Sequence, residues 1–289
     1  MPLVATRPEG SDPRIAGMAF DYRVRFGLGP TDPYRLAAAQ GAQDAVAYGV
    51  LDQLVADDFF ADLTSCLAAS RPWERLLDDR KERTLTRFCV VLAHLESAAR
   101  AGTRVLLSED FARRFADSSS DELLEAVTST AVADITAMTT LTTSAVAAWH
   151  RAIRFGAPYH PNPTFAGSAL IGGADADMIV GDEIVEIKTS GKATSAEVRK
   201  ALQQLAGYTL LDFDDSFAIR NLTVWFPRLD WLRTWPVHAV LSAPGGKPYA
   251  WTVGEPRLPE VENRLAEFRN KMRIACTDLV HFASGPTGT

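Results

Sequence analysis

The sequence has few cysteines and no long apolar run. Its three cysteines, Cys66, Cys89 and Cys276, form neither a Cys-x-x-Cys pair nor a zinc spacing. We therefore expect reduced, buried thiols, as in cytosolic proteins. No run of about 20 apolar residues occurs, and the N-terminus lacks the basic and apolar segments of a secretory signal. These absences predict a cytoplasmic protein without a membrane span.

An excess of positive charge is also absent. The formal net charge is −6 over 289 residues, whereas free-standing nucleic-acid binders usually carry a basic surface. This balance argues against tight, nonspecific, metal-free binding to DNA. It does not exclude a nucleic-acid enzyme, because an acidic metal site adds negative charge and a basic track can be local. The length is sufficient for one large domain or two modest ones.

The most informative stretch spans residues 173–189. Two short apolar runs flank Gly181-Asp182, and such a Gly-x pair favours a β-hairpin with a tight II′-type turn. In the register that this turn dictates, Asp177 lies opposite Glu186 on one face. Side chains alternate along a strand, so Lys188 shares the face of Glu186. The sequence therefore predicts two carboxylates and an ammonium group side by side.

Two carboxylates opposite each other in a sheet repel and destabilise it. A divalent cation between them would turn this repulsion into ligation. Carboxylate oxygens suit Mg²⁺ or Mn²⁺, and Mg²⁺ does not need a complete protein cage. Lys188 would then stabilise a phosphoryl transition state or position the attacking water. This face is a candidate site for metal-assisted phosphodiester hydrolysis; the alternative is a surface hairpin with solvated charges.

A helix is predicted directly after the hairpin. Thr194-Ser195-Ala196-Glu197 fits a capping box. Gln204 and Tyr208 lie four residues apart and so share one face of this helix. Its buried stripe is predicted at Val198, Leu202, Leu205 and Thr209. The alternative is an ordinary amphipathic helix with a half-buried tyrosine.

These motifs resemble a known family of enzymes. Asp177, the apolar strand and Glu186-Ile187-Lys188 resemble the signature of the PD-(D/E)XK nucleases, and Gln204-x-x-x-Tyr208 resembles the Q-x-x-x-Y element of their RecB-like branch. The resemblance implies that Asp177, Glu186 and the Ile187 carbonyl bind Mg²⁺ or Mn²⁺. It also implies that Lys188 positions or activates water, and that Gln204 and Tyr208 orient the substrate. Some members hold an iron–sulfur cluster, for which three cysteines are too few.

RecB-like nucleases begin their core with a helix carrying Gly-x-x-x-His, whose histidine helps to hold the metal. Gly17 and Asp21 have this spacing in a helix predicted over residues 15–26, with aspartate in place of histidine. An aspartate can ligate Mg²⁺, so Asp21 is a further candidate ligand. The alternative is a packing helix with Asp21 in solvent. No H-x-x-x-H pair involves His94, His150 or His160, which we expect to be structural.

The order of predicted elements defines three segments. Residues 1–32 comprise a disordered start and the first core helix. Residues 33–157 read as nearly all helix and form an insertion, and residues 158–289 form the nuclease core. Strands are predicted over 165–171, in the hairpin, and over 221–227 and 236–242, with a closing helix over 259–282. The fold class is therefore α/β, resembling the restriction-endonuclease-like αβββαβ core with a large all-helical N-terminal insertion.

The sequence thus predicts a Mg²⁺-dependent nuclease that hydrolyses DNA, in phage defence or DNA repair. The alternative is a catalytically weak or inactive nuclease-fold subunit that binds nucleic acid or a partner within a larger complex. The helical insertion would guide DNA or dock a protein partner. Basic surface around the hairpin favours the enzyme, and a large apolar patch on the insertion favours the subunit. DNA or RNA, single or double strands, and endo- or exonucleolytic action all stay open at this point.

Overall fold

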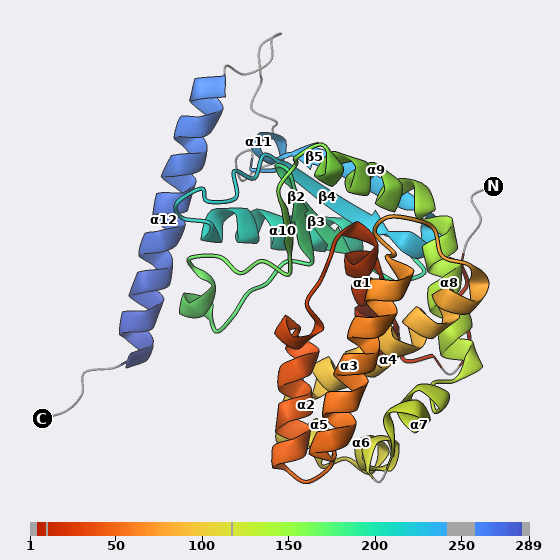
Figure 1. Cartoon of the computed structure of the whole chain (residues 1–289). Helices are drawn as coiled ribbons and strands as arrows, with labels where there is room; N and C mark the ends of the chain where they lie inside the picture. The colour runs from red at the N-terminus through yellow and green to blue at the C-terminus, as the bar shows by residue number, and fades with distance from the viewer. Residues whose placement is uncertain (1–4, 10, 117, 242–257, 285–289) are drawn as a thin grey trace, which may run out of the picture. The chain divides into compact units, whose positions relative to one another are not determined.

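The computed structural model describes residues 5–9, 11–116, 118–241 and 258–284 (Figure 1). The chain is a mixed α/β protein that divides into two compact units. The first comprises Met1–Arg151 together with the short pieces Thr189–Gly191 and Pro227–Asp230. The second comprises Ala152–Lys188, Lys192–Phe226 and Trp231–Thr289.

The first unit is helical in its described residues. Its helices are α1 (Pro13–Leu28), η1 (Pro33–Arg35), α2 (Ala37–Ala47), α3 (Gln53–Ser70), α4 (Asp79–Ala101), α5 (Thr103–Leu106), α6 (Glu109–Phe115), α7 (Ser120–Glu125), α8 (Ser129–Leu141) and the greater part of α9 (Thr143–Arg154). Several begin at side-chain caps that satisfy a free backbone N–H, such as Asp12 for α1 and Asp78 for α4. The predicted run of helices after residue 33 is confirmed.

Helix α4 is the centre of this unit and packs against α1, α2 and α8. Gly41 lets α2 approach it closely, because a Cβ at this position would lie 1.9 Å from the carbonyl oxygen of Leu95. In the described part of the chain no single helix has both the length and the apolar composition to cross a membrane. Helices α8 and α9 meet these limits only as a pair, and they are bent by 64° at their junction.

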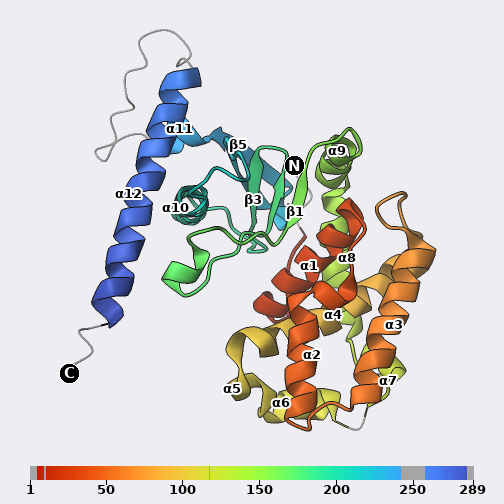
Figure 2. The same ribbon diagram turned by 60° about the vertical axis from the view of Figure 1, so that its left-hand side comes forward.

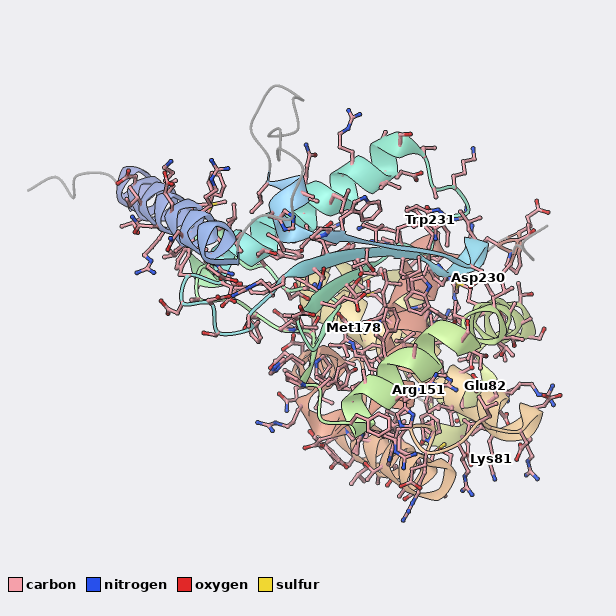
Figure 3. All side chains as sticks on the ribbon, turned by 90° about the horizontal axis from the view of Figure 1, so that it is seen from above. Lys81, Glu82, Arg151, Met178, Asp230 and Trp231 are labelled. Carbon is pink, nitrogen blue, oxygen red and sulfur yellow. The ribbon has the colours of Figure 1, made fainter. Side chains whose placement is uncertain are left out.

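The second unit is built on a five-stranded sheet in the order β1-β2-β3-β4-β5. The strands are β1 (Tyr159–Pro161), β2 (Met178–Val180), β3 (Glu183–Ile187), β4 (Asn221–Phe226) and β5 (Trp231–Pro236). Neighbours are antiparallel except β3 and β4, which are parallel and joined by the crossover helix α10 (Ser195–Leu211). Figure 2 shows α10 beside the sheet, and Figure 3 labels Met178 on β2 and Trp231 on β5.

The predicted hairpin is confirmed in its turn and register. Met178 pairs with Val185, Ile179 with Ile184 and Val180 with Glu183. Gly181 has φ of +63°, whereas Asp182 is not among the described residues with positive φ. A II′ turn needs this combination, because only its first central residue occupies the region that favours glycine. The local sequence therefore determines which side chains share a face.

The crossover helix also begins where the sequence predicts. The Thr194 side chain accepts from the Glu197 N–H, and Glu197 accepts from the Thr194 N–H, completing the capping box. Leu205 and Thr209 are buried as predicted, but Val198 and Leu202 are only half-buried. Ala201, Ala206 and Leu211 occupy the remaining buried positions.

Two of the predicted strands are wrong. Residues 165–171 do not form a strand; the edge strand is β1, and Ser168–Ile171 form the 3₁₀ turn η2. The Ser168 hydroxyl accepts from the Phe165 N–H at 2.8 Å and donates to the Ala174 carbonyl at 2.6 Å. These bonds replace ladder pairing and turn the chain.

The other wrong strand is that over residues 236–242, of which residue 242 lies outside the described residues. The strand β5 ends at Pro236, and Val237–Val240 form the helical turn α11. Proline cannot donate to a ladder, which suits the end of this edge strand.

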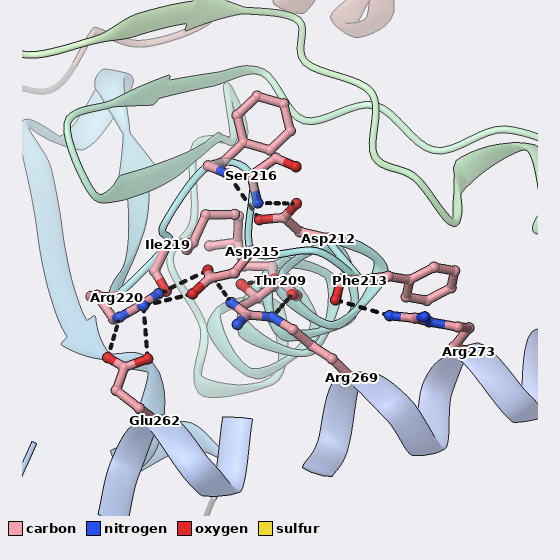
Figure 4. Close-up of polar contacts among 12 residues, drawn as sticks. Thr209, Asp212, Phe213, Asp215, Ser216, Ile219, Arg220, Glu262, Arg269 and Arg273 are labelled. Carbon is pink, nitrogen blue, oxygen red and sulfur yellow. Dashed lines mark hydrogen bonds and ion pairs between the residues drawn. The ribbon is translucent and has the colours of Figure 1, made fainter. Parts of the chain in front are cut away.

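The closing helix α12 (Leu258–Ser284) confirms the helix predicted over 259–282. A network of ion pairs joins it to the end of α10 and the residues that follow. Arg220 contacts both Asp215 and Glu262 at 2.7 Å (Figure 4). Arg269, which is 3% exposed, pairs with Asp215 at 2.7 Å and donates to the Thr209 carbonyl. The pKa of the Asp215 carboxyl is lowered, because these two guanidinium groups outweigh the opposing effect of its partial burial.

Candidate active site

The predicted site lies in the second unit, where the hairpin meets α10. Asp177 directly precedes β2, Glu186 lies within β3, and Lys188 follows the last residue of β3. Glu186 is 4% exposed, and a carboxylate is almost never buried to this degree unless it is paired. The parallel strands β3 and β4 both end on this side, and the carboxyl ends of parallel strands are where α/β sheets commonly place ligand sites.

The Asp177 carboxylate is fixed by the backbone of β3. Its Oδ2 accepts a hydrogen bond from the Ile187 N–H at 2.6 Å. The ladder itself ends at Met178 and Val185, so the side chain of Asp177 takes the place of the next backbone acceptor. This bond holds the carboxylate at the end of the β2–β3 pair, where it acts on the pKa of Lys188; the predicted pairing of Asp177 with Glu186 lies beyond the observed ladder. An ionised acceptor makes such a bond short and strong.

Lys188 forms an ion pair with Glu186. Its Nζ also lies 3.4 Å from Oε1 of Gln204 on α10. Partial burial on its own would lower the pKa of Lys188, but the Glu186 and Asp177 carboxylates raise it above the ordinary value. Lys188 is therefore an ammonium at neutral pH, which suits a fixed positive charge and not a proton acceptor.

Gln204 connects Lys188 to Tyr208. Lys188 can only donate, so Gln204 presents its carbonyl oxygen to Nζ and its amide nitrogen to the Tyr208 oxygen, which is 2.8 Å away. Tyr208 accepts this bond, and its own O–H hydrogen is left to point to a ligand. Its ring stacks on Phe165 with centroids 5.5 Å apart. Burial and the carboxylates of Glu186, Asp175 and Asp177 raise the pKa of Tyr208, so the phenol stays neutral.

The charges and donor atoms of this cluster fit a hard divalent cation. Asp175, Asp177 and Glu186 all act on the pKa of Tyr208, and among these five side chains Lys188 is the single cation. Among the described residues, no group of three or more His, Cys, Asp or Glu side chains has metal-binding geometry. Two carboxylates and a backbone carbonyl nevertheless satisfy what Mg²⁺ takes from a protein, because it retains several waters.

Asp21 belongs to the first unit and has a different partner. Its carboxylate pairs with Arg25, one turn later on α1, and its side chain is 13% exposed. The Arg25 guanidinium also lies over the Tyr22 ring, 5.4 Å from its centroid. The alternative expectation, an Asp21 exposed to solvent, is therefore wrong. A ligand role for Asp21 stays a prediction.

One contributor to the site and one contact within the first unit were not found from the sequence. Phe165 was expected in a strand, but it supplies the ring under Tyr208. Arg228, in the first unit, donates from Nε to the carbonyl of Thr189 at 2.7 Å, and Thr189 is the residue after Lys188. Nothing in the local pattern around Pro227-Arg228 indicates this bond, because its partner is 39 positions away.

Comparison of the chain with protein-family models, with curated proteins and with solved structures finds no significant match. The resemblance to PD-(D/E)XK nucleases therefore stays a prediction from the motifs.

Proposed function

We propose that this chain is a Mg²⁺- or Mn²⁺-dependent nuclease that hydrolyses phosphodiester bonds of DNA, on a restriction-endonuclease-like core. One observation carries the proposal. The 2.6 Å hydrogen bond from the Ile187 N–H to Asp177 brings a second carboxylate to the Glu186–Lys188 pair. A solvated surface hairpin does not explain a Glu186 that is 4% exposed.

Asp177, Glu186 and the Ile187 carbonyl would hold the metal ion. When bound, the ion would supply a Lewis acid for the phosphate and lower the pKa of a ligated water. The protein fixes both carboxylates before binding, one through a backbone amide and one within a strand. Such preorganisation lowers the ordering cost at the moment of reaction.

Lys188 would stabilise negative charge on the phosphate. Against the opposing effect of its partial burial, the Glu186 and Asp177 carboxylates raise its pKa, which suits a fixed positive charge beside a phosphate. The side chain is 34% exposed while Glu186 is nearly covered, so the cation borders solvent where a phosphate would enter. Gln204 limits its rotation from the other side.

Gln204 and Tyr208 would orient the substrate. The Tyr208 O–H is a neutral donor suited to a phosphate oxygen. Exposed basic side chains also lie near the start of α10, namely Lys192, Arg199 and Lys200. Exposed basic residues in and just before the helix that carries Gln204 support the enzyme over a binding subunit, because a phosphate backbone needs local positive charge despite the net charge of −6. The family resemblance, and not the geometry, selects DNA.

A cleavage assay tests this proposal. Purified protein is incubated with labelled single- and double-stranded DNA and RNA, in Mg²⁺, Mn²⁺ or EDTA, beside Lys188→Ala prepared in the same way. We expect cleavage of DNA that requires the metal and is lost in Lys188→Ala. Absence of cleavage on all four substrates, with retained binding, would contradict the enzyme and identify the inactive subunit of the alternative.

A further inference from the structure

A cavity of about 230 Å³ lies within the first unit, away from the hairpin residues in the sequence. It is partly open to solvent and is lined by α1, by the connection after α3, by the end of α8 and by the start of α9. Phe20, Val24, Trp73 and Val146 are among its lining residues, so most of its wall is apolar. Neither the proposed nuclease site nor its candidate ligands lie among the lining residues.

One charged side chain in this wall has an unused donor. Arg23 is 8% exposed, and its Nε and Nη2 donate to the two oxygens of Glu82, each at 2.7 Å. Figure 3 labels Glu82 on α4. Among the described residues, Nη1 of Arg23 has no hydrogen-bond partner. Nη1 is not one of the fully buried atoms without a partner, so it borders the open space of the cavity, where the acceptor atom of a ligand can reach it.

Gly27 keeps this nitrogen accessible. A Cβ at position 27 would lie 3.1 Å from Nη1 of Arg23 and 3.5 Å from Cγ1 of Val146. Gly27 lies within α1, where glycine is unfavourable by about 1 kcal/mol relative to alanine. A helical glycine that leaves space over an unused N–H is explained if something occupies that space.

Several of the remaining polar groups of the wall already donate to backbone carbonyls. The hydroxyls of Thr139, Thr142 and Thr143 donate to carbonyls within α8, at 3.0, 2.8 and 3.2 Å. Arg75 donates to the carbonyls of Ser70 and Ala69. The apolar wall therefore selects an apolar body, and the Nη1 group selects one hydrogen-bond acceptor on it.

The charge of the ligand follows from the Arg23–Glu82 pair. Glu82 is also 8% exposed and already neutralises Arg23. Glu74 and Arg75 also line the cavity and add one charge of each sign, so a carboxylate placed on Nη1 would add a negative charge that no side chain of the wall balances. A neutral carbonyl oxygen accepts the same hydrogen bond without that penalty.

We propose that this cavity binds a small, neutral aromatic molecule whose carbonyl oxygen accepts a hydrogen bond from Nη1 of Arg23. The aromatic body packs against the apolar wall beside Trp73. This site is independent of the proposed nuclease activity. Aryl ketones and aryl amides represent the ligand class.

Three matched probes test the site: acetophenone, which carries the carbonyl; toluene, which lacks an acceptor; and benzoate, which carries a negative charge. Binding is measured by ligand-observed NMR titration of the full chain. We expect saturable binding of acetophenone, with toluene and benzoate each weaker by about tenfold, the loss expected for one hydrogen bond to a charged donor. Equal binding of acetophenone and toluene, or no saturable binding of any probe, would overturn the proposal.

Gly27→Ala places a methyl group over Nη1, so it should remove the acetophenone preference. Gly207→Ala on α10 is the matched control, because a Cβ there meets nothing within 4 Å. Circular dichroism and melting temperature verify the fold of both variants. If Gly27→Ala does not fold, Val146→Met replaces it, because the longer side chain fills the cavity from α9. Wild-type affinity for acetophenone in the cavity-filled variant would place the binding elsewhere and contradict the site.

Discussion

Arg228 and Asp134 form a two-pronged ion pair in which both side chains are 1% exposed. Nη1 and Nη2 of Arg228 lie 2.5 and 2.7 Å from the two carboxylate oxygens. Nε of the same guanidinium holds the Thr189 carbonyl, and the Arg228 carbonyl accepts from the N–H of the buried Ala5. One buried cation thus joins α8, the N-terminal segment and the residue that follows Lys188.

Removing one partner of this pair should be strongly destabilising. We expect Asp134→Ala to lower the free energy of unfolding by about 3–5 kcal/mol, because it leaves a buried guanidinium without its counter-charge. Urea denaturation measures the change. Asp110→Ala is the control, since Asp110 is 93% exposed in its pair with Arg113 and should matter by about 1 kcal/mol or less. A similar small effect for Asp134→Ala would refute the role of the pair.

Lys188→Ala should abolish metal-dependent cleavage. From the sequence we expect the fold to be unaffected, but the structure leads to a further expectation. Glu186 is 5% exposed in its side chain and loses its ionic partner, so the metal-free variant should be less stable by about 1–3 kcal/mol. Added Mg²⁺ should restore much of this loss by neutralising Glu186.

Melting temperatures with and without Mg²⁺ measure the loss of stability in Lys188→Ala and its recovery. Lys271→Ala is the control, because it removes the ammonium group of an exposed lysine. Cleavage by Lys188→Ala within a few-fold of wild type would contradict its assigned role.

Asp177→Asn separates the charge of Asp177 from its hydrogen bond. The asparagine carbonyl oxygen can still accept from the Ile187 N–H, while the repulsion with Glu186 is removed. The metal-free protein should therefore become more stable, by up to about 1 kcal/mol. The shift in melting temperature caused by Mg²⁺ should shrink, because a ligand stabilises only through its affinity for the native state.

Asp177→Ala provides the comparison, since it loses the charge and the hydrogen bond together and should be less stable than Asp177→Asn. If Asp177→Asn retains the full Mg²⁺-induced shift, Asp177 does not ligate the metal.

Asp21 can be tested by metal affinity and stability together. If it occupies the position of the histidine in RecB-like nucleases, Asp21→Asn lowers Mg²⁺ affinity by about ten- to a hundred-fold, and Asp21→His keeps part of the activity. Isothermal titration calorimetry measures the affinity. An Asp21→Asn variant that is less stable but binds Mg²⁺ like wild type would show that pairing with Arg25 is its whole role.

His94 should make the fold sensitive to acid. Burial, and then the nearby Arg114 guanidinium, lower the pKa of His94 to about 3, against a smaller opposing effect of Asp12. The folded chain keeps His94 neutral, whereas the unfolded chain takes up a proton below about pH 6.5. Its contribution is therefore complete above that pH and is lost as the pH falls toward 3, by up to about 1.4 kcal/mol per pH unit.

Unfolding free energies of wild type and His94→Gln between pH 8 and pH 4 test this expectation. The difference between the two proteins should change with pH in favour of the variant as the solution becomes acidic. Parallel pH profiles would show that His94 is not protected from protonation in the folded state.

The sequence by itself determined the features that depend on neighbouring residues. Gly181 sets the hairpin turn, and the turn sets the register that places Asp177 beside the Glu186–Lys188 strand. The Thr194–Glu197 capping box likewise sets the start of α10. In each case the deciding contact lies within a few residues, so the local pattern contains the information.

Only the tertiary structure decided the features that depend on distant partners. Residues 168–171 of the strand expected over 165–171 form a turn, and the strand that pairs with β2 is β1, which lies earlier in the chain. Pairing with β2 depends on packing and not on the local sequence pattern. Arg228 and Asp134 are 94 positions apart, and Arg23 and Glu82 are 59 apart. The sequence does not distinguish a charged residue that is solvated from one that is buried with a partner. The tertiary structure decides, because folding excludes water from the buried residue and brings its partner to it.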